Sequence, residues 1–273
     1  MTYKMIVLDL DDTLLRDDQT ISPRTKEALM AAQEMGVKVV LASGRPTFGM
    51  QHIAEELELS KYGSYILSFN GGKIINWQTR EEIFSSTLSR DEVHGLYEIS
   101  RREGVHIHTY IEDEIVTEED NEFSRIESEL TGLPLRVVDS FKDAVSEPVV
   151  KTLMVYDPDR LQVVEALLQD ELSTQFSVMR SKPYFLEFTE LGVTKGTSLK
   201  QLIDACGIKQ EEVIAIGDSF NDQAMIEFAG LGVAMGNAHE DIKAIANHVT
   251  DTNMNDGVAK VVEEFIFRKP VMV

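Results

Sequence analysis

The chain has 273 residues, of which 43% are hydrophobic, so it is long enough for two domains that each bury a core. Its net charge of −21 and the lack of any Lys/Arg-rich run argue against a nucleic-acid-binding protein, because phosphate backbones are bound by basic patches. Cys206 is the only cysteine, the N-terminus has no signal-peptide pattern, and no stretch approaches the roughly 20 apolar residues of a membrane span, so we expect a soluble, cytoplasmic protein.

Up to about residue 72 the sequence alternates apolar, strand-like runs with helical segments. Short apolar runs bounded by polar residues indicate buried strands, and Ser22-Pro23 is a typical helix start, with a capping Ser and Pro at the first position. Asn70-Gly71-Gly72 is a strong turn signal. The alternation indicates a parallel sheet with helices packed on it. We expect strands at 4–8, 37–42 and 65–69, and helices at 23–36 and 46–59.

From about residue 85 the pattern changes. Ser89 and Glu92 form a capping box at the start of a helix. The run at 105–111 alternates like a strand with one exposed face, and with no Cys or further His nearby we expect no metal site at His106 and His108. These features indicate a separate α+β unit of ordinary domain size. We expect helices at 90–103, 118–130 and 158–172, the second with a solvated acidic start, and strands at 105–111, 151–156, 175–180 and 184–188.

After Thr194 the first pattern returns. One pattern on both sides of another predicts a domain inserted into a host, and insertions are tolerated in surface loops near the functional end of a sheet. The predicted fold class is α/β: a Rossmann-like parallel-sheet core of residues 1–84 and 188–273 with an inserted α+β cap at 85–187. We expect helices at 196–206, 220–229 and 239–246, strands at 212–216 and 231–234, and a last element at 258–267.

Asp9-Leu10-Asp11-Asp12-Thr13 directly follows the first predicted strand. Alternation in an extended chain puts Asp9, Asp11 and Thr13 on one side, and open parallel sheets bind ligands at the carboxyl ends of their strands. An acidic turn that only caps the next segment is the alternative interpretation.

The segment 217–222, Gly-Asp-Ser-Phe-Asn-Asp, repeats this arrangement after the strand at 212–216. A helix N-terminus with acids in its first turn has the same composition, because the helix dipole favours negative charge there. Two acidic clusters at two strand ends repel each other, however, and need a cation. All-oxygen ligation suits Mg²⁺, so the hypothesis is a magnesium site between the clusters.

Two further segments offer groups for an anion. Ser43-Gly44-Arg45 follows a strand, where a hydroxyl and backbone N–H groups can hold a phosphate, although a Ser cap beside a surface Arg is the ordinary interpretation. Lys195 begins a helix, where positive charge is mildly unfavourable unless an anion is bound. Phosphoryl transfer requires these groups together: a nucleophile, acids for a metal, a hydroxyl and a lysine at one sheet edge.

Together these segments resemble the four motifs of the haloacid dehalogenase superfamily: Asp-x-Asp-x-Thr, Ser/Thr, Lys and Gly-Asp-x-x-Asn-Asp, in this order and spacing. The insertion between Arg45 and Lys195 is similar to the large cap of the Cof-like sugar-phosphatase subfamily. Ser-Phe-Asn-Gly-Gly at 68–72 and Asn-Asp-Gly-Val at 255–258 also resemble segments of that subfamily. No catalytic position departs from the pattern.

The resemblance implies that Asp9 attacks phosphorus, and that Asp11 protonates the leaving oxygen and then takes a proton from the hydrolytic water. Asp11 must carry its proton near neutral pH, well above the free Asp pKa of about 3.9, which a neighbouring carboxylate and burial would permit. The implied cofactor is Mg²⁺, held by the Asp9 side chain, the Asp11 backbone carbonyl and Asp218. Thr13 and Asp222 are implied to orient the residues that contact the metal or the phosphate. Phosphate or substrate binding is implied for Leu10, Ser43, Gly44, Arg45, Asn70, Lys195 and Asn221.

The implied activity is that of a magnesium-dependent phosphatase, a phosphoric monoester hydrolase acting on small phosphorylated metabolites such as sugar phosphates. A phosphomutase, which passes the phosphoryl group to a sugar, is an open alternative. A non-catalytic phospho-signalling domain similar to response-regulator receivers is another, although such a domain needs no substrate lid. We expect a small phosphorylated substrate as partner, and neither nucleic acid nor a membrane.

Overall fold

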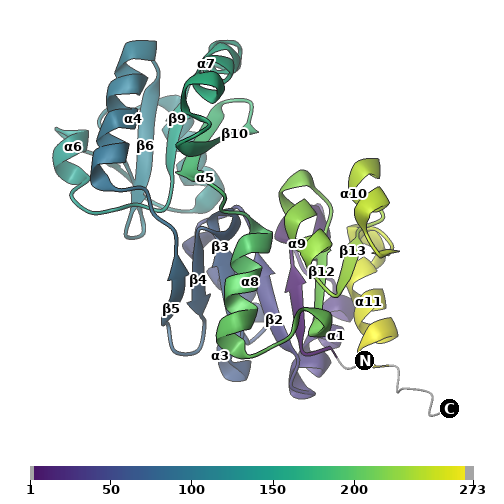
Figure 1. Ribbon diagram of the computed structural model, residues 1–273. Coiled ribbons are helices and arrows are strands. Elements are labelled where there is room, and N and C mark those ends of the chain that lie inside the picture. The colour runs from purple at the N-terminus through teal and green to yellow at the C-terminus, as the bar shows by residue number, and fades with distance from the viewer. Residues whose placement is uncertain (1–2, 268–273) are drawn as a thin grey trace. The chain divides into compact units, whose positions relative to one another are not determined.

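A computed structural model describes residues 3–267 of the chain, which divides into two compact units. The first, termed the host unit, comprises the chain up to Phe84 and from Thr194 onward, and the second, the inserted unit, comprises Ser85–Val193 (Figure 1). The second junction lies at Val193 rather than at the expected residue 187, because strand β11 (Phe185–Glu190) continues past that point.

The host unit is built, within the described residues, on an eight-stranded sheet in the order β14-β13-β12-β1-β2-β3-β4-β5. Strand β1 lies between β12 and β2 and pairs parallel with both. Strand β3 on one side, and strands β13 and β14 on the other, continue the parallel pairing, so the carboxyl ends of six strands lie at one edge. Strand β4 pairs antiparallel with β3. The strands are β1 (Met5–Leu8), β2 (Lys38–Ala42), β3 (Tyr65–Ser68), β4 (Lys73–Asn76), β5 (Glu82–Ser85), β12 (Val213–Gly217), β13 (Leu231–Ala234) and β14 (His248–Val249).

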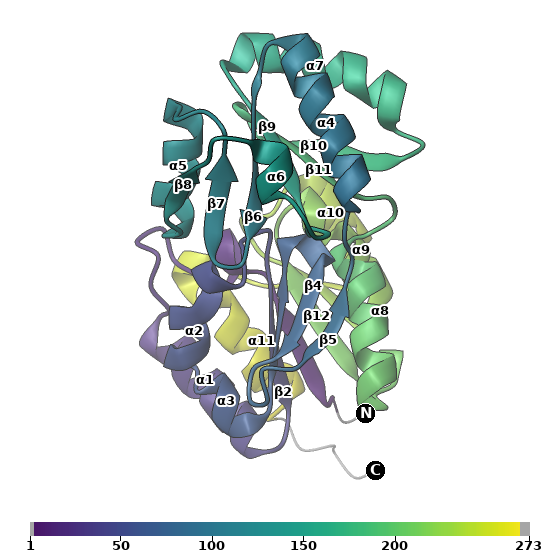
Figure 2. The same cartoon turned by 90° about the vertical axis from the view of Figure 1, so that its left-hand side faces the viewer.

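Helices cover both faces of the host sheet. Ile6 and Leu8 of β1 pack into a core with residues of α1, α2 and α11, whereas Met5 and Val7 pack on the other face with residues of α8 and α9. Figure 2 shows α1, α2 and α11 on one side of this sheet and α8 on the other. Burial on both faces explains the continuous apolar runs of these strands. The helices are α1 (Pro23–Glu34), α2 (Gln51–Glu56), α3 (Leu59–Tyr62), α8 (Lys195–Cys206), α9 (Gln223–Phe228), α10 (Glu240–Ile245) and α11 (Gly257–Phe265).

Two expected helices of the host unit begin later than predicted. Pro46 does not open a helix; a 3₁₀ turn, Phe48–Met50, comes first and α2 begins at Gln51. This helix also stops at Glu56, because Glu58 adopts a left-handed backbone with φ of 50°. A second 3₁₀ turn, Phe220–Asp222, precedes α9. The sequence does not predict strands β4, β5 and β14.

The inserted unit has, among its described residues, a six-stranded sheet in the order β10-β11-β9-β6-β7-β8. Its strands pair antiparallel, except that β7 and β8 pair parallel. Met154 and Phe188 of the sheet pack with Leu161 of α7 in a hydrophobic core. The elements are β6 (His106–Ile111), β7 (Glu114–Thr117), β8 (Leu135–Val137), β9 (Thr152–Val155), β10 (Phe176–Lys182), β11, α4 (Arg90–Glu103), α5 (Glu122–Thr131), α6 (Phe141–Ala144) and α7 (Pro158–Leu172).

Two expectations for the inserted unit are wrong, and a third is only partly right. Helix α5 begins at Glu122 rather than at residue 118, because the Asn121 side chain caps it by accepting from the Ser124 N–H. Glu119, Asp120 and Glu122 are exposed, as expected. Glu118 lies before the helix and is not solvated, because its carboxylate accepts hydrogen bonds from Tyr97 and from the Phe141 N–H. The inner residues of β6 are all buried, so this strand has no exposed face. Strands β7 and β8 and helix α6 are also not predicted.

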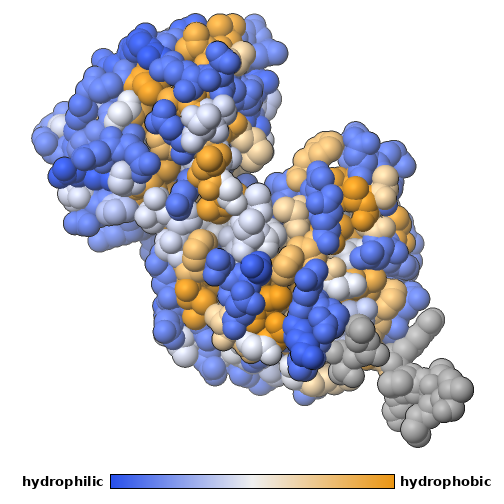
Figure 3. Space-filling view, in the orientation of Figure 1, coloured by the Kyte–Doolittle hydropathy of each residue, from blue (hydrophilic) through white to orange (hydrophobic). Residues whose placement is uncertain are grey.

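Hydrophilic residues predominate on the face of each unit that Figure 3 shows, with smaller hydrophobic areas between them. In the part of the chain that the structure describes, no helix combines the length and the apolar composition that crossing a membrane requires.

Candidate active site

The predicted site residues follow the strands of the host sheet at one edge. Asp9 follows β1, Ser43 follows β2, and Asn70 lies two residues after β3. Asp218 follows β12, which is the neighbour of β1. Because these strands are parallel, their carboxyl ends bring together side chains that are far apart in the sequence.

Lys195 joins two of the acidic residues. Its ammonium nitrogen lies 2.5 Å from Oδ1 of Asp9 and 2.6 Å from Oδ1 of Asp222. The side chains of Lys195 and Asp222 are fully buried, and Asp9 is 6% exposed. The next residue, Gly196, allows α8 to pack closely against α9, because a Cβ at this position would lie only 2.4 Å from the Ala224 carbonyl oxygen. This close packing buries the start of α8, where Lys195 lies. Lys195 is therefore a buried structural and electrostatic partner of Asp9, not a solvated lysine.

Asp222 has little capacity left for a metal ion. Its Oδ1 accepts from Lys195, and its Oδ2 accepts from the backbone N–H groups of Asp218 and Ser219, each at 3.0 Å. Gly217 makes room for this carboxylate, since a Cβ on Gly217 would lie 2.5 Å from Asp222 Cγ. The arrangement fits a residue that orients Lys195 and the turn carrying Asp218.

Asp9, Asp218 and Asp222 bring one carboxylate oxygen each to within 4.8 Å of one another. The Thr13 hydroxyl donates to Oδ1 of Asp218 at 2.8 Å and so fixes that side chain. Asp9 and Asp218 each retain a carboxylate oxygen directed at neither Lys195 nor Thr13. Carboxylate oxygens at such spacing suit Mg²⁺, which prefers a few carboxylates together with water and substrate oxygens.

The electrostatics of this cluster also favour a cation. Burial, and next the charge of Asp222, raise the pKa of the Asp9 carboxyl well above its usual range, against the opposing effect of Lys195. Burial and the charge of Asp222 likewise raise the pKa of Asp218 to about 6. Burial by itself would lower the pKa of Lys195, but the carboxylates of Asp222 and Asp9 outweigh it and keep the lysine charged. Three carboxylates thus face one ammonium, an excess of negative charge that a divalent cation would neutralise.

Asn70 and Asn221 meet beside the loop that carries Gly44. The Asn221 amide donates to Oδ1 of Asn70 at 3.0 Å, and a Cβ on Gly44 would lie 3.2 Å from Asn70 Nδ2. The Asn70 N–H donates to the Ser43 carbonyl, and the Arg45 N–H donates to the Ser43 hydroxyl. These contacts bring five of the seven predicted phosphate-binding or substrate-binding residues into one group. Leu10 has a fully buried side chain, so its backbone is what it can offer a ligand.

The loop carrying Asn70 has an unusual backbone. Phe69, Asn70 and Gly71 have φ values of 54°, 55° and 105°. Left-handed conformations at non-glycine residues are uncommon and persist where the surroundings hold them. Here Ser198 of α8 donates to the Gly71 carbonyl at 2.7 Å, and a Cβ on Gly71 would lie 2.5 Å from the Thr194 carbonyl oxygen. The loop is thus fastened to the helix that carries Lys195.

The Asp11 carboxylate does not belong to the acidic cluster. It accepts two hydrogen bonds from Arg45, from Nε at 3.1 Å and from Nη2 at 2.5 Å. Arg45 Nη2 also donates to Oε1 of Gln19 at 2.5 Å. The side chain of Asp11 is 51% exposed and that of Arg45 is 23% exposed. Asp11 and Arg45 are thus in contact, and Arg45 binds Asp11 and not Asp9.

The sequence interpretation missed a hollow of about 440 Å³ beside Asp218. Asn237 donates to the Asp12 carbonyl at 2.7 Å and accepts from the Asn253 N–H, and so fixes the turn after β1. Asn237 follows the end of β13, so the rule that located Asp9 and Asp218 could also have located it. The residues that line the hollow are Asp12, Asp17, Asp218, Asn237, Thr252, Asn253 and Met254.

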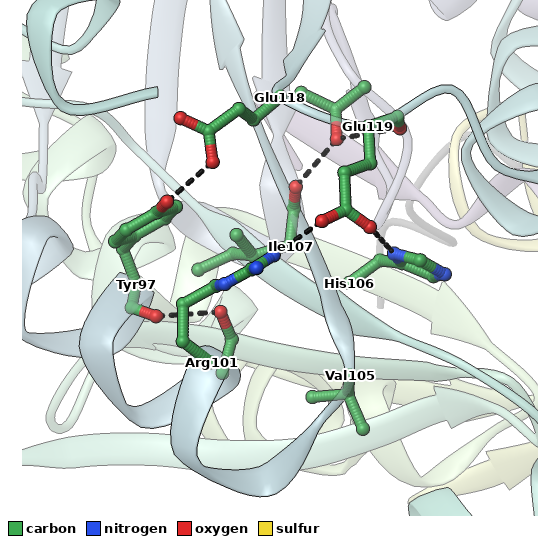
Figure 4. Close-up of a pocket in the computed structure, with 9 residues that line it drawn as sticks. Tyr97, Arg101, Val105, His106, Ile107, Glu118 and Glu119 are labelled. Atoms are coloured by element: carbon green, nitrogen blue, oxygen red, sulfur yellow. Dashed lines mark hydrogen bonds and ion pairs between the residues drawn. The ribbon is translucent and has the colours of Figure 1, made fainter. Parts of the chain in front are cut away.

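The two histidines of β6 lie in different surroundings (Figure 4 shows those of His106). His106 contacts the Glu119 carboxylate at 2.8 Å, and Glu119 also binds Arg101. The cavity beside them has a volume of about 10 Å³, roughly the room for one water molecule. His108 is fully buried, with Nδ1 at 2.8 Å from the Ser124 hydroxyl. No group of three potential metal-binding side chains includes a histidine among the residues described.

A family model for haloacid dehalogenase-like hydrolases matches residues 6–262. The chain is 31% identical over 265 residues to the 5-amino-6-(5-phospho-D-ribitylamino)uracil phosphatase YcsE of Bacillus subtilis, with 96% of each chain covered. A solved haloacid dehalogenase-like hydrolase from Bacteroides thetaiotaomicron has a TM-score of 0.91 and 45% identity, over 96% of this chain and 99% of that one. For the HAD subclass IIB sugar phosphatase BT4131 the TM-score is 0.79 and the identity 28%, over 96% and 98%. The chain therefore belongs to the haloacid dehalogenase-like hydrolases, as a phosphoric monoester hydrolase.

Proposed function

We propose that this chain is a magnesium-dependent phosphatase of small phosphorylated metabolites, with sugar phosphates as the leading class, and that it works through an aspartyl phosphate on Asp9. The observation that carries the proposal is the position of Asp9, held by Lys195 and close to Asp218 at the carboxyl end of the central strand. A carboxylate nucleophile beside a buried ammonium and further acids is what phosphoryl transfer uses.

The reaction proceeds in two displacements. An oxygen of Asp9 attacks phosphorus, the bond from phosphorus to the ester oxygen breaks, and that oxygen takes a proton from Asp11. Water then attacks the phosphorus of the aspartyl phosphate and gives a proton to Asp11. The bond to the Asp9 oxygen breaks, inorganic phosphate leaves, and both acids return to their starting states.

The metal would be held by the Asp9 carboxylate, the Asp11 backbone carbonyl and Asp218. When bound, Mg²⁺ supplies positive charge that neutralises the carboxylates and the phosphoryl oxygens. The Thr13–Asp218 and Asp222–Lys195 contacts support this assignment, because each fixes the orientation of a group that touches the phosphoryl group or the metal.

The phosphoryl oxygens would be bound by Ser43, Lys195, Asn221 and the backbone amides of Leu10 and Gly44. Asn70 would contribute its amide from the same group. The hydrogen bond between Asn221 and Asn70, and the close approach of Asn70 to Gly44, support a common binding surface.

We assign substrate selection to the inserted unit, residues 85–187 in the sequence interpretation. Support comes from two relatives with different substrates in their names, a sugar phosphatase and a phosphatase of a phosphorylated ribitylaminouracil, both of which the chain matches over nearly its whole length. Both names describe small phosphorylated molecules with a polyhydroxylated chain or ring, which is the substrate class proposed here.

The test is phosphate release from p-nitrophenyl phosphate and from a panel of sugar phosphates, with Mg²⁺, with EDTA and with Ca²⁺. We expect activity with Mg²⁺, loss with EDTA, and poor replacement by Ca²⁺, whose coordination is larger and less regular. Full activity in EDTA would exclude the metal assignment. Isomerisation of a sugar phosphate that requires a bisphosphate activator, in place of phosphate release, would identify a phosphomutase.

A further inference from the structure

We infer that Gln19 is a positioning residue for the reaction: it holds the Arg45 guanidinium, which in turn fixes the carboxylate of Asp11. The inference rests on the proposed function, in which Asp11 moves the protons. It adds a residue that no catalytic motif of the sequence contains.

The contact with Asp11 is geometrically specific. Nε and Nη2 of Arg45 bind the two carboxylate oxygens of Asp11 separately, at 3.1 Å and 2.5 Å. A two-point contact between two planar groups fixes the plane of the carboxylate, which a single hydrogen bond does not. Asp11 needs this restraint, because its side chain is 51% exposed and a free exposed side chain samples several rotamers.

Gln19 completes the restraint on the guanidinium. Arg45 Nη2 donates both to Oδ1 of Asp11 and to Oε1 of Gln19, each at 2.5 Å. Arg45 Nη2 has two N–H groups, and Gln19 accepts from the one that does not bind Asp11. The Gln19 amide is neutral and would bind a phosphate only weakly. The contact therefore fits a role in orienting Arg45 better than a role in binding the charge of the substrate.

The loop that carries Gln19 is itself well held. The Gln19 N–H donates to the Arg16 carbonyl, and the Arg16 N–H donates to the Thr20 carbonyl. Gln19 has φ of 63°, a conformation that a non-glycine residue keeps only where its surroundings impose it. Asn253 anchors the start of the loop by donating to the Leu15 carbonyl at 3.0 Å. The loop backbone therefore keeps Gln19 within reach of Arg45.

A surface ion pair alone contributes little to stability, commonly about 0–1 kcal/mol, so stability does not explain this arrangement. Catalysis does, because the rate of a proton transfer depends steeply on the placement of the acid. The consequence is selective: Gln19 matters when the leaving oxygen needs a proton and matters little when it does not.

The test compares Gln19→Ala with wild type on two substrates. One is a sugar phosphate that wild type hydrolyses, whose alkoxide needs protonation, and the other is p-nitrophenyl phosphate, whose phenolate leaves unprotonated. We expect kcat/KM to fall about tenfold on the sugar phosphate and about twofold or less on p-nitrophenyl phosphate. Inhibition by inorganic phosphate should be unchanged in Gln19→Ala. Gln78→Ala, an exposed glutamine after β4, is the matched control and should behave as wild type.

The same substitution is then made in Asp11→Asn, where Gln19 has no acid left to position. Gln19→Ala should have no further effect in that background. Equal losses on both substrates, weaker phosphate inhibition, or an undiminished effect in Asp11→Asn would overturn the inference while leaving the phosphatase assignment intact. A folded wild type that hydrolyses no phosphate ester would overturn the proposed function and this inference together.

Discussion

Each unit of the molecule contains a buried lysine paired with a carboxylate, and the two sites differ in charge balance. In the host unit, Lys195 binds Asp9 and Asp222, with Asp218 close by, so three carboxylates share one ammonium. In the inserted unit, Lys151 donates to Glu187 at 3.0 Å, with both side chains at least nine-tenths buried. The first site holds an excess of negative charge that folding alone does not need.

The excess of negative charge at the Lys195 site indicates a functional role, whereas the balanced Lys151–Glu187 pair indicates a structural one. Crowded carboxylates lower stability but bind a cation and a phosphoryl group, a common feature of functional sites. Lys151 and Glu187 instead connect the start of β9 to β11, its neighbour in the sheet. Loss of a carboxylate from the first site should therefore cost activity without a cost in stability, whereas loss of Lys151 should cost stability without a cost in activity.

The largest expected effect is that of Asp9→Asn. It removes the attacking oxygen but keeps the side-chain shape, so kcat should fall on the order of 10⁵-fold or more, as for other covalent nucleophiles. The melting temperature should stay equal or rise, because one of three crowded carboxylates is gone. Rapid-quench labelling with p-nitrophenyl phosphate should trap phosphate on wild type and on Asp11→Asn.

No label should be trapped on Asp9→Asn, and label retained there would remove Asp9 from its role. Asp204→Asn, an exposed position on the helix that carries Lys195, is the matched control for both measurements. A clear drop in the melting temperature of Asp9→Asn would contradict the charge comparison even if activity were lost.

The second prediction replaces each lysine by Met, which keeps length and removes charge. Lys195→Met should lower kcat/KM about 10²–10³-fold, the usual cost of one donor to transition-state charge. Lys151→Met leaves Glu187 buried without its charged partner, so the free energy of unfolding should fall by about 3–5 kcal/mol. Hydrolysis of p-nitrophenyl phosphate by folded Lys151→Met should match wild type.

Urea unfolding and steady-state kinetics on both variants check this pair. Loss of activity in Lys151→Met with full stability would contradict the structural role assigned to Lys151. The charge comparison would also fail if Lys195→Met kept its kcat/KM.

The smallest expected effect concerns acid stability of the inserted unit. Burial, and next the charge of Lys151, lower the pKa of His108 to about 3. The unfolded chain, with a His pKa of about 6.5, therefore binds the proton first. Stability from neutral His108 is complete above about pH 6.5 and is lost as the pH falls from there toward 3.

At about pH 5 the loss should be on the order of 2 kcal/mol, and it should be absent in His108→Asn, which can still bind Ser124. The measurement is the difference in unfolding free energy between about pH 7.5 and pH 5 for wild type and variant. Burial raises the pKa of Glu127 nearby, which acts in the opposite direction, but that contribution is common to both proteins and cancels. Identical pH slopes would contradict the assignment to His108.

The helices that were predicted well begin with signals that are contiguous in the sequence. Ser22 accepts from the Thr25 N–H, and Ser89 forms both hydrogen bonds of its capping box with Glu92. Asp157 caps α7 by accepting from the N–H groups that follow Pro158. Such caps act within one turn, so the local sequence is sufficient to predict them.

The failures depend on contacts between distant residues. Strand β7 pairs antiparallel with β6 and parallel with β8. Its apolar run is too short to predict a strand by itself, and only pairing with these two strands makes it one. The acidic run from Glu118 resembles a helix start in composition. Glu118 instead binds Tyr97 and the Phe141 backbone, which no local pattern reveals.

The site shows the same division. The strand-end rule predicts that Asp9, Ser43 and Asp218 meet, and they follow β1, β2 and β12 at the same sheet edge. The direction of an individual side chain is set by neighbours from other segments. The contact of Asp11 with Arg45 and Gln19 is therefore beyond a sequence pattern, and the catalytic roles stay predictions until the variants are measured.

Gly71 and Ser198 have a consequence for how such enzymes diversify. Gly71 precedes the insertion in the chain and Ser198 follows it, yet they are hydrogen-bonded within the host unit. The strands before the insertion and the helix carrying Lys195 after it are thus joined directly, without the inserted unit as an intermediary. If substrate selection belongs to the inserted unit, as proposed, a change in the length or sequence of the insertion would leave this contact between the groups that bind phosphate in place. On that proposal, a new substrate would require a changed insertion and not a changed phosphate site.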